Sequence, residues 1–473
     1  MNRYKKLLTS SSILMIGNLG TKFGSIFLLP LYTKYLSTSE YGIADLSITF
    51  INLLLPVITM SVFEMFMNDV IQHPTKRQHF LKNVSCLLFF TNMCAWIISH
   101  ILYEMGYIHI DYSILLLMLI LMTLQSYNNL ISNFLRAINK NIIYAVFNLI
   151  QTILLIALAI IMLQNLKLGL IGYFYANIGA YAVVLLLATP TVFFPKKHKM
   201  LKEKSNQPQF NLIYLKQLIK KSLPLIPNAL MWWGINSADK VFIVLILGTS
   251  ASGLFAAANK LPMFITMLST VFFQAWQVSA MEEVHSEYKE EFYTSVFRGF
   301  IFLMNLGVLF LYIFMKPIAN ILFSDGFSQS ISYIPFLILA AYFSNIASLL
   351  GANCIAEGET SFVFRSSIFC AVINIMLSPI FIKEMGLHGA GISASISFLF
   401  LAYIRFAKVR KVSGLKMTHQ SFLIQISVSI ITTILFTLTH FFVGVLIILL
   451  IYIGFQWNYF RQAKSFIKDN YKI

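Results

Sequence analysis

The chain has 473 residues, of which 58% are hydrophobic and only 11% are charged, and its formal net charge is +17. This composition excludes a soluble globular domain of this length. The positive charge by itself would suit a nucleic-acid-binding protein, but its distribution along the chain, described below, argues against that class.

Long apolar segments predict an all-α polytopic membrane protein. A membrane-spanning helix needs about 20 apolar residues, and hydropathy indicates about 14 such spans in this chain. In chain order they lie near residues 12–32, 42–66, 83–103, 113–135, 142–163, 168–194, 223–247, 253–279, 294–315, 331–356, 361–382, 387–407, 421–441 and 442–459.

The lysine and arginine residues predict the orientation of these spans. If the N-terminus is cytoplasmic, the outer loops hold only Lys34, Lys167, Lys316 and Lys383 of the 35 lysines and arginines. This is the positive-inside pattern, and it places both termini in the cytoplasm. Topology and contact with anionic lipids therefore explain most of the positive charge, and no nucleic-acid partner is expected.

A polar stretch near 195–222 divides the chain. Within it, Leu212, Leu215, Leu218 and Ile219 recur at helical spacing with lysines on the other side, which predicts a short amphipathic helix at the membrane surface. A merely solvated linker is the alternative. The expected organisation is given by four ranges: 1–195 for a first lobe of six spans, 196–222 for a cytoplasmic linker, 223–410 for a second six-span lobe, and 411–473 for two final spans and a basic tail.

Weak internal repeats favour two related lobes. Residues 36–43, which follow the first span, resemble residues 247–254, which follow the seventh. A second echo relates residues 168–172 to residues 385–389. Because six spans separate the copies, the two pseudo-symmetric lobes have the same orientation and are related by an axis along the membrane normal.

Several polar residues lie inside spans that otherwise suit a lipid environment. A charge at membrane depth costs roughly 2.5–3.5 kcal/mol and usually faces a water-filled cavity or a partner. Helical periodicity therefore predicts a central cavity lined by Asn18, Lys22, Asp45, Asn52, Asn228, Asn236, Asp239, Lys240, Lys260, Gln274 and Arg298. Asp45, Glu64 and Asp239 are candidate carriers of a coupling proton or sodium ion. The alternatives are interhelical hydrogen bonds for the amides, structural ion pairs for Asp239 and Lys240, and a membrane-anchoring role for Arg298.

No nucleotide-binding loop, metal-ligand cluster or nucleophile constellation stands out, so we expect a transporter without a cofactor or metal and not an enzyme. A membrane glycan polymerase or ligase is the alternative from a different class. Such an enzyme should present a sizeable outer loop, whereas the predicted outer connections here have about 15 residues or fewer.

The basic N-terminus, the first span with Asn18 and Lys22, and the segment 36–42 resemble the start of bacterial polysaccharide flippases (Wzx-like). These flippases belong to the multidrug/oligosaccharidyl-lipid/polysaccharide (MOP) exporter superfamily, and the resemblance extends over essentially the whole chain. It implies a carrier in the bacterial cell membrane that moves undecaprenyl-pyrophosphate-linked oligosaccharide from the inner to the outer leaflet by alternating access, for cell-surface polysaccharide biosynthesis.

The same resemblance implies further properties. A cationic cavity would take the anionic glycan or pyrophosphate, and a lateral groove near the last two helices would admit the lipid tail. Transport would be coupled to a proton or sodium gradient or to the membrane potential, with a polysaccharide polymerase and assembly proteins as partners. The repeats predict that a monomer suffices. A lipid II flippase and an ion-coupled multidrug exporter are the alternatives, although lysines on three spans suit a cationic drug poorly.

Overall fold

The computed structural model describes residues 24, 26–193, 211–282 and 288–439 of the chain. Every element in these ranges is helical, and contacts group them into unit 1, Met1–Ser237, and unit 2, Ala238–Ile473. Eleven of the described helices are long and apolar enough to cross a membrane. The predicted all-helical polytopic fold is therefore confirmed. The last predicted span and most of the first lie outside the described residues.

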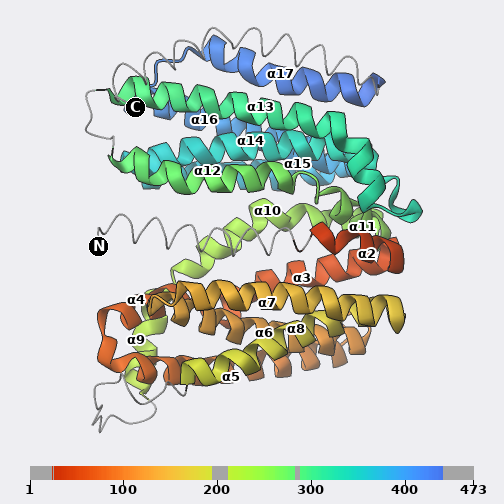
Figure 1. The fold of residues 1–473 in the computed structure, drawn as a ribbon, viewed down its shortest axis with the longest axis vertical. Coiled ribbons are helices and arrows are strands. Elements are labelled where there is room, and N and C mark those ends of the chain that lie inside the picture. The colour runs from red at the N-terminus through yellow and green to blue at the C-terminus, as the bar shows by residue number, and fades with distance from the viewer. Residues whose placement is uncertain (1–23, 25, 194–210, 283–287, 440–473) are drawn as a thin grey trace. The chain divides into compact units, whose positions relative to one another are not determined.

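Unit 1 runs from the first described helix into the middle of α10 (Figure 1). Its elements are α2 (Leu29–Tyr35), α3 (Thr38–Ile58), α4 (Phe63–Gln72), η1 (Pro74–Lys76), α5 (Arg77–Glu104), α6 (Tyr112–Ala137), α7 (Asn141–Ala159), the π-helical turn η2 (Ile160–Asn165), α8 (Gly169–Phe193), α9 (Leu212–Ser222) and α10 (Leu225–Leu247).

Unit 2 takes the rest of α10 and the C-terminal helices, with α14 packed extensively against α16 and α17 packed on α13 and α14. Its further elements are α11 (Thr249–Ala258), α12 (Met263–Glu282), α13 (Lys289–Leu322), η4 (Asp325–Phe327), α14 (Ser330–Ala356), α15 (Thr360–Met385), α16 (Leu387–Val412) and α17 (His419–Thr439).

Two segments that hydropathy predicts as single spans are interrupted. The segment 42–66 breaks between α3 and α4, where Met60 and Ser61 have φ of 51° and 47°. The Ser61 amide bonds the Pro56 carbonyl five residues earlier, which closes the α3 end. The segment 253–279 breaks between α11 and α12, because Pro262 disfavours helical geometry in the residue before it. Lys260 therefore lies in this break and does not share a helix with Gln274.

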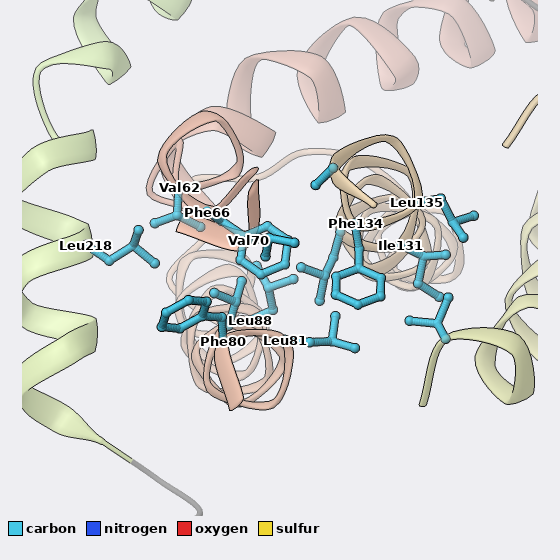
Figure 2. Packing of buried hydrophobic residues seen from close by; sticks show 14 of the residues in the cluster. Val62, Phe66, Val70, Phe80, Leu81, Leu88, Ile131, Phe134, Leu135 and Leu218 are labelled. Atoms are coloured by element: carbon cyan, nitrogen blue, oxygen red, sulfur yellow. The ribbon is translucent and has the colours of Figure 1, made fainter. Parts of the chain in front are cut away.

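The α3–α4 break is held by a compact apolar core (Figure 2). Val62, Phe66 and Val70 are fully buried and pack with side chains from α5, α6 and α9. From α9, Leu218 enters this core, whereas Leu212 is 69% exposed. Part of the apolar face of α9 thus packs on protein, and the predicted contact of this helix with the membrane surface stays a prediction.

The repeated glycine motif adopts the same conformation in both units. Gly169 and Gly386 open α8 and α16 with φ of 55° and 62°, a region that favours glycine. Three residues later, Gly172 and Gly389 lie against the preceding helical segment, where an added Cβ would come within 3.1 Å of the Met162 carbonyl oxygen and 2.0 Å of the Phe381 carbonyl oxygen. The weak sequence echo therefore marks a real structural repeat.

Glu40 ties the first copy of this motif to the start of α3. Its carboxylate accepts from the Ser37 amide at 2.8 Å and the Ser37 hydroxyl at 2.9 Å, while Ser37 Oγ accepts from the Glu40 amide. The second carboxylate oxygen accepts from the Leu170 amide at 3.3 Å. One side chain thus caps α3 and binds the first turn of α8.

We expect Glu40→Ala to lower the free energy of unfolding by about 1–2 kcal/mol, because the cap and the tie to α8 are lost together. The melting temperature of the purified protein measures this effect. Glu104→Ala, at the exposed end of α5, is the matched control and should melt like the wild type. Equal melting temperatures for both variants would contradict the assigned role of Glu40.

Candidate functional site: a polar pocket and a buried carboxylate

A pocket of about 400 Å³ lies in unit 1 at the α3–α4 break. It is formed by α3, α4, α6 and the first turns of α10. Its polar lining consists of Asn52, Thr59, Ser61, Glu64, Asn129, Asn133 and Asn228. The structure thus brings together three of the residues singled out in the sequence, namely Asn52, Glu64 and Asn228, and adds Asn129 and Asn133.

The first half of α10 is fixed to unit 1 by an indole hydrogen bond. Trp233 Nε1 donates to the Thr49 carbonyl of α3 at 2.9 Å. This bond positions the start of α10 beside α3, so that Asn228 faces the pocket at the break. Trp233 therefore serves as a positioning residue for the pocket, a role that the sequence alone did not reveal.

The second half of α10 carries Asp239, the centre of a buried polar cluster in unit 2. Asp239 is 9% exposed. Asn374 Nδ2 donates to both carboxylate oxygens at 3.1 and 3.3 Å, and Ser378 Oγ donates to Oδ1. Ser378 also shares a 3.0 Å hydrogen bond with Ser393 of α16. Two side chains of α15 therefore donate to the carboxylate on α10, and Ser393 of α16 extends the cluster through Ser378.

No lysine, arginine or histidine within the described ranges forms an ion pair with Asp239. Lys240 is the next residue and cannot share its helical face. The immediate partners of Asp239 are neutral amide and hydroxyl groups. A buried charge without a counter-charge is costly unless hydrogen bonds stabilise it.

The other predicted residues have varied surroundings. Asp45 is half-buried on α3, Lys240 is half-buried on α10, and exposed Asn236 donates to the carbonyl of Trp232 at 2.7 Å. Asn18, Lys22 and the side chain of Gln274 lie outside the described residues. The structure thus does not test the cationic cavity, which stays a prediction.

Arg298 belongs to a set of charged residues at one end of unit 2, where α14 and α16 end and α13, α15 and α17 begin. It donates to the Lys416 carbonyl at 3.4 Å. Lys289 pairs with Glu357 at 2.7 Å, and Lys408 pairs with Glu359 at 2.7 Å. Hydrogen bonding and charge from Glu291 raise the pKa of Lys416, with a smaller contribution from Glu290. The three connections predicted as cytoplasmic in this unit therefore meet at one end, as that topology requires.

Arg405 is a buried residue that the sequence analysis did not identify. It is 4% exposed, and its guanidinium donates to Ser366 Oγ at 3.1 Å, Ser367 Oγ at 2.8 Å and the Ala347 carbonyl at 2.8 Å. These partners lie on α14 and α15, while Arg405 lies on α16. Within the described part of the chain its partners are neutral acceptors. The arrangement joins three helices.

The periodicity that identified the first two polar spans of each lobe would also have found four of the missed residues, although not Trp233 or Arg405. Asn129 and Asn133 are four residues apart in the fourth predicted span, and so are Asn374 and Ser378 in the eleventh. Residues at this spacing share a helical face. In both cases that face forms part of a polar site in the structure.

The fold resembles those of solved membrane transporters. No protein-family model matches the sequence, and no curated protein matches it. Solved structures do match over most of their length. A structure of lipid II flippase MurJ in an inward closed conformation has a TM-score of 0.65 and 16% identity, covering 95% of this chain and 99% of that chain.

Two further matches are transporters of the MOP superfamily. An inward-facing multidrug resistance MATE transporter has a TM-score of 0.61 and 16% identity, covering 86% of this chain and 96% of its own. A MOP superfamily transporter from Pyrococcus furiosus is described as having a binding pocket of reverse polarity. It has a TM-score of 0.58 and 17% identity, and the match covers 88% of this chain and 97% of that transporter. At these identities the likeness shows a shared fold.

Proposed function

We propose that the protein is a flippase that carries undecaprenyl-pyrophosphate-linked oligosaccharide from the inner to the outer leaflet of the bacterial cell membrane. The observation that carries this proposal is the buried Asp239 cluster, a polar centre that forms no ion pair with any described residue and lies inside apolar helices long enough to span a membrane. The basic residues Lys22, Lys240 and Lys260, at span depth by sequence, supply charge for the pyrophosphate.

We further propose that Asp239 couples translocation to a proton or sodium gradient. Of the three candidate carboxylates, it is the one that is buried: Asp45 is half-buried, and Glu64 is exposed in the pocket. A buried carboxylate whose partners are a neutral amide and a hydroxyl can take up a proton or a monovalent cation to neutralise its charge. Occupancy would neutralise the charge and favour a different arrangement of α10.

A lipid II flippase is the second candidate, because lipid II has the same undecaprenyl-pyrophosphate anchor and the fold of MurJ covers 95% of this chain. An ion-coupled multidrug exporter is the third. A transport assay with all three substrates distinguishes them, since the preferred substrate competes with the other two. Competition by a cationic drug would favour the exporter.

We expect the double substitution Lys22→Ala and Lys260→Ala to slow translocation of a polyprenyl-pyrophosphate oligosaccharide in liposomes about tenfold, equivalent to about 1.4 kcal/mol. The reason is the loss of two cations that attract the pyrophosphate. Lys316→Ala with Lys383→Ala removes two lysines from predicted outer loops and should leave the rate unchanged.

An unchanged rate in the Lys22 and Lys260 variant would assign these lysines a structural role. If the folded wild-type protein moves no lipid-linked glycan, the flippase proposal fails. A function as a multidrug exporter is then favoured.

A further inference from the structure

The pocket at the α3–α4 break differs in its chemistry from a phosphate site. Four of its seven polar lining residues are asparagines, two are the hydroxyl residues Thr59 and Ser61, and the seventh is Glu64. Among the described lining residues there is no lysine, arginine or histidine. A phosphate group would meet a carboxylate here and no compensating cation, so this pocket disfavours the pyrophosphate end of a lipid-linked substrate.

Three of the four asparagine side chains in the pocket form no hydrogen bond within the described part of the chain. Elsewhere in the spans, Asn92, Asn177 and Asn345 each donate to the carbonyl four residues earlier. In the pocket Asn133 does the same, donating to the Asn129 carbonyl at 2.8 Å. By contrast, the side chains of Asn52, Asn129 and Asn228 make no hydrogen bond with any residue that the structure describes.

These free amides define what the pocket can bind. Each asparagine side chain offers two N–H donors and one acceptor, and the hydroxyls and Glu64 add further acceptors. Leu55, Pro56 and Phe63 supply an apolar wall next to these groups. A sugar ring presents hydroxyls that both donate and accept, together with apolar C–H faces. The volume of about 400 Å³ lies in the range of small-ligand sites.

We infer that this pocket is a saccharide subsite, which holds an uncharged sugar residue of the transported lipid-linked oligosaccharide through Asn52, Asn129 and Asn228. The inference rests on the proposed function and specifies which part of the substrate unit 1 recognises. Glu64 accepts sugar hydroxyls and repels acidic sugars, so it also sets the charge preference of the subsite. The pyrophosphate is left to basic residues elsewhere in the chain.

Binding of two probes to the full chain in lipid nanodiscs tests the inference. One probe is undecaprenyl pyrophosphate carrying a single N-acetylglucosamine, and the other is undecaprenyl pyrophosphate without sugar. Asn129→Leu and Asn228→Leu replace each amide by an apolar group of similar size. We expect the dissociation constant of the sugar-bearing probe to rise about fivefold for each variant, which corresponds to the loss of about one hydrogen bond.

The sugar-free probe should bind both variants within about twofold of the wild type, which also shows that the variants are folded. Asn128→Leu is the matched control, because it alters the neighbouring residue of α6 outside the pocket lining. Equal weakening of both probes, no weakening of either, or a wild type that binds both probes equally would overturn the saccharide subsite. A wild type that binds neither probe would overturn the proposed function, and this inference with it.

Discussion

Replacement of Asp239 by asparagine is expected to abolish the dependence of translocation on a cation gradient. Asparagine has the same shape as the neutral carboxyl group and can still bond Ser378 and Asn374. The variant should therefore fold, but it has no charge to be neutralised by a proton or cation. We expect its rate under a gradient to fall at least about tenfold, to the level that the wild type shows without one.

The measurement follows translocation in proteoliposomes with an imposed gradient. One arm replaces sodium by potassium at constant pH, and the other varies pH in the absence of sodium, so that the coupling ion is identified as well. Asp45→Asn and Glu64→Gln are matched controls that neutralise the other two candidate carboxylates. Full gradient dependence in Asp239→Asn, or its loss in a control alone, would refute the assignment to Asp239.

Arg405→Ala is expected to be the most destabilising single substitution considered for this chain. It removes hydrogen bonds to residues of α14 and α15 and leaves a cavity, and together these losses should cost about 3–5 kcal/mol. Arg405→Lys retains the charge but not the planar fork of donors, so it should lie between alanine and the wild type. Thermal unfolding of the purified proteins ranks the stability of the wild type, Arg405→Lys and Arg405→Ala.

Arg410→Ala is the control for Arg405, because Arg410 is exposed near the end of the same helix. It should not change the melting temperature. Gly351 provides a second check, since an added Cβ there would lie 2.7 Å from Arg405 Nη1. Gly351→Ala should therefore destabilise the protein by displacing the guanidinium. If Arg405→Ala has the same melting temperature as the wild type, the guanidinium does not stabilise the packing of these helices.

Features of the fold that depend on patterns along the chain could be predicted from the sequence. The apolar runs predict the helical fold, and the Gly169 and Gly386 motifs predict the repeat, because each depends on local spacing. The breaks after Ile58 and Ala258 could not be predicted in the same way. Hydropathy averages over about 20 residues, and the break segments remain apolar enough to leave that average high.

Only some of the functional and buried polar residues could be predicted, because the others depend on contacts between helices. Asn52, Glu64 and Asn228 were found because they interrupt apolar spans, and they meet in one pocket. Arg405 was missed because it lies near the end of a span, where a basic residue usually anchors a helix to the membrane surface. Its burial depends on serines and a carbonyl from two other helices, and such tertiary contacts leave no mark in the local sequence.

Helix α10 carries residues of both proposed sites. Trp233 of this helix forms a hydrogen bond within unit 1, Asp239 forms hydrogen bonds within unit 2, and Asn228 lies in the first turns. Asn228 and Asp239 are about 16 Å apart along a continuous helix. Gly234 lies between Trp233 and Asp239. No described atom lies within 4 Å of an added Cβ at this position, so packing does not require a glycine there. One helix thus carries an amide of the proposed saccharide subsite and the carboxylate of the proposed ion site, and Gly234 makes the stretch between them a less stable helix than alanine would.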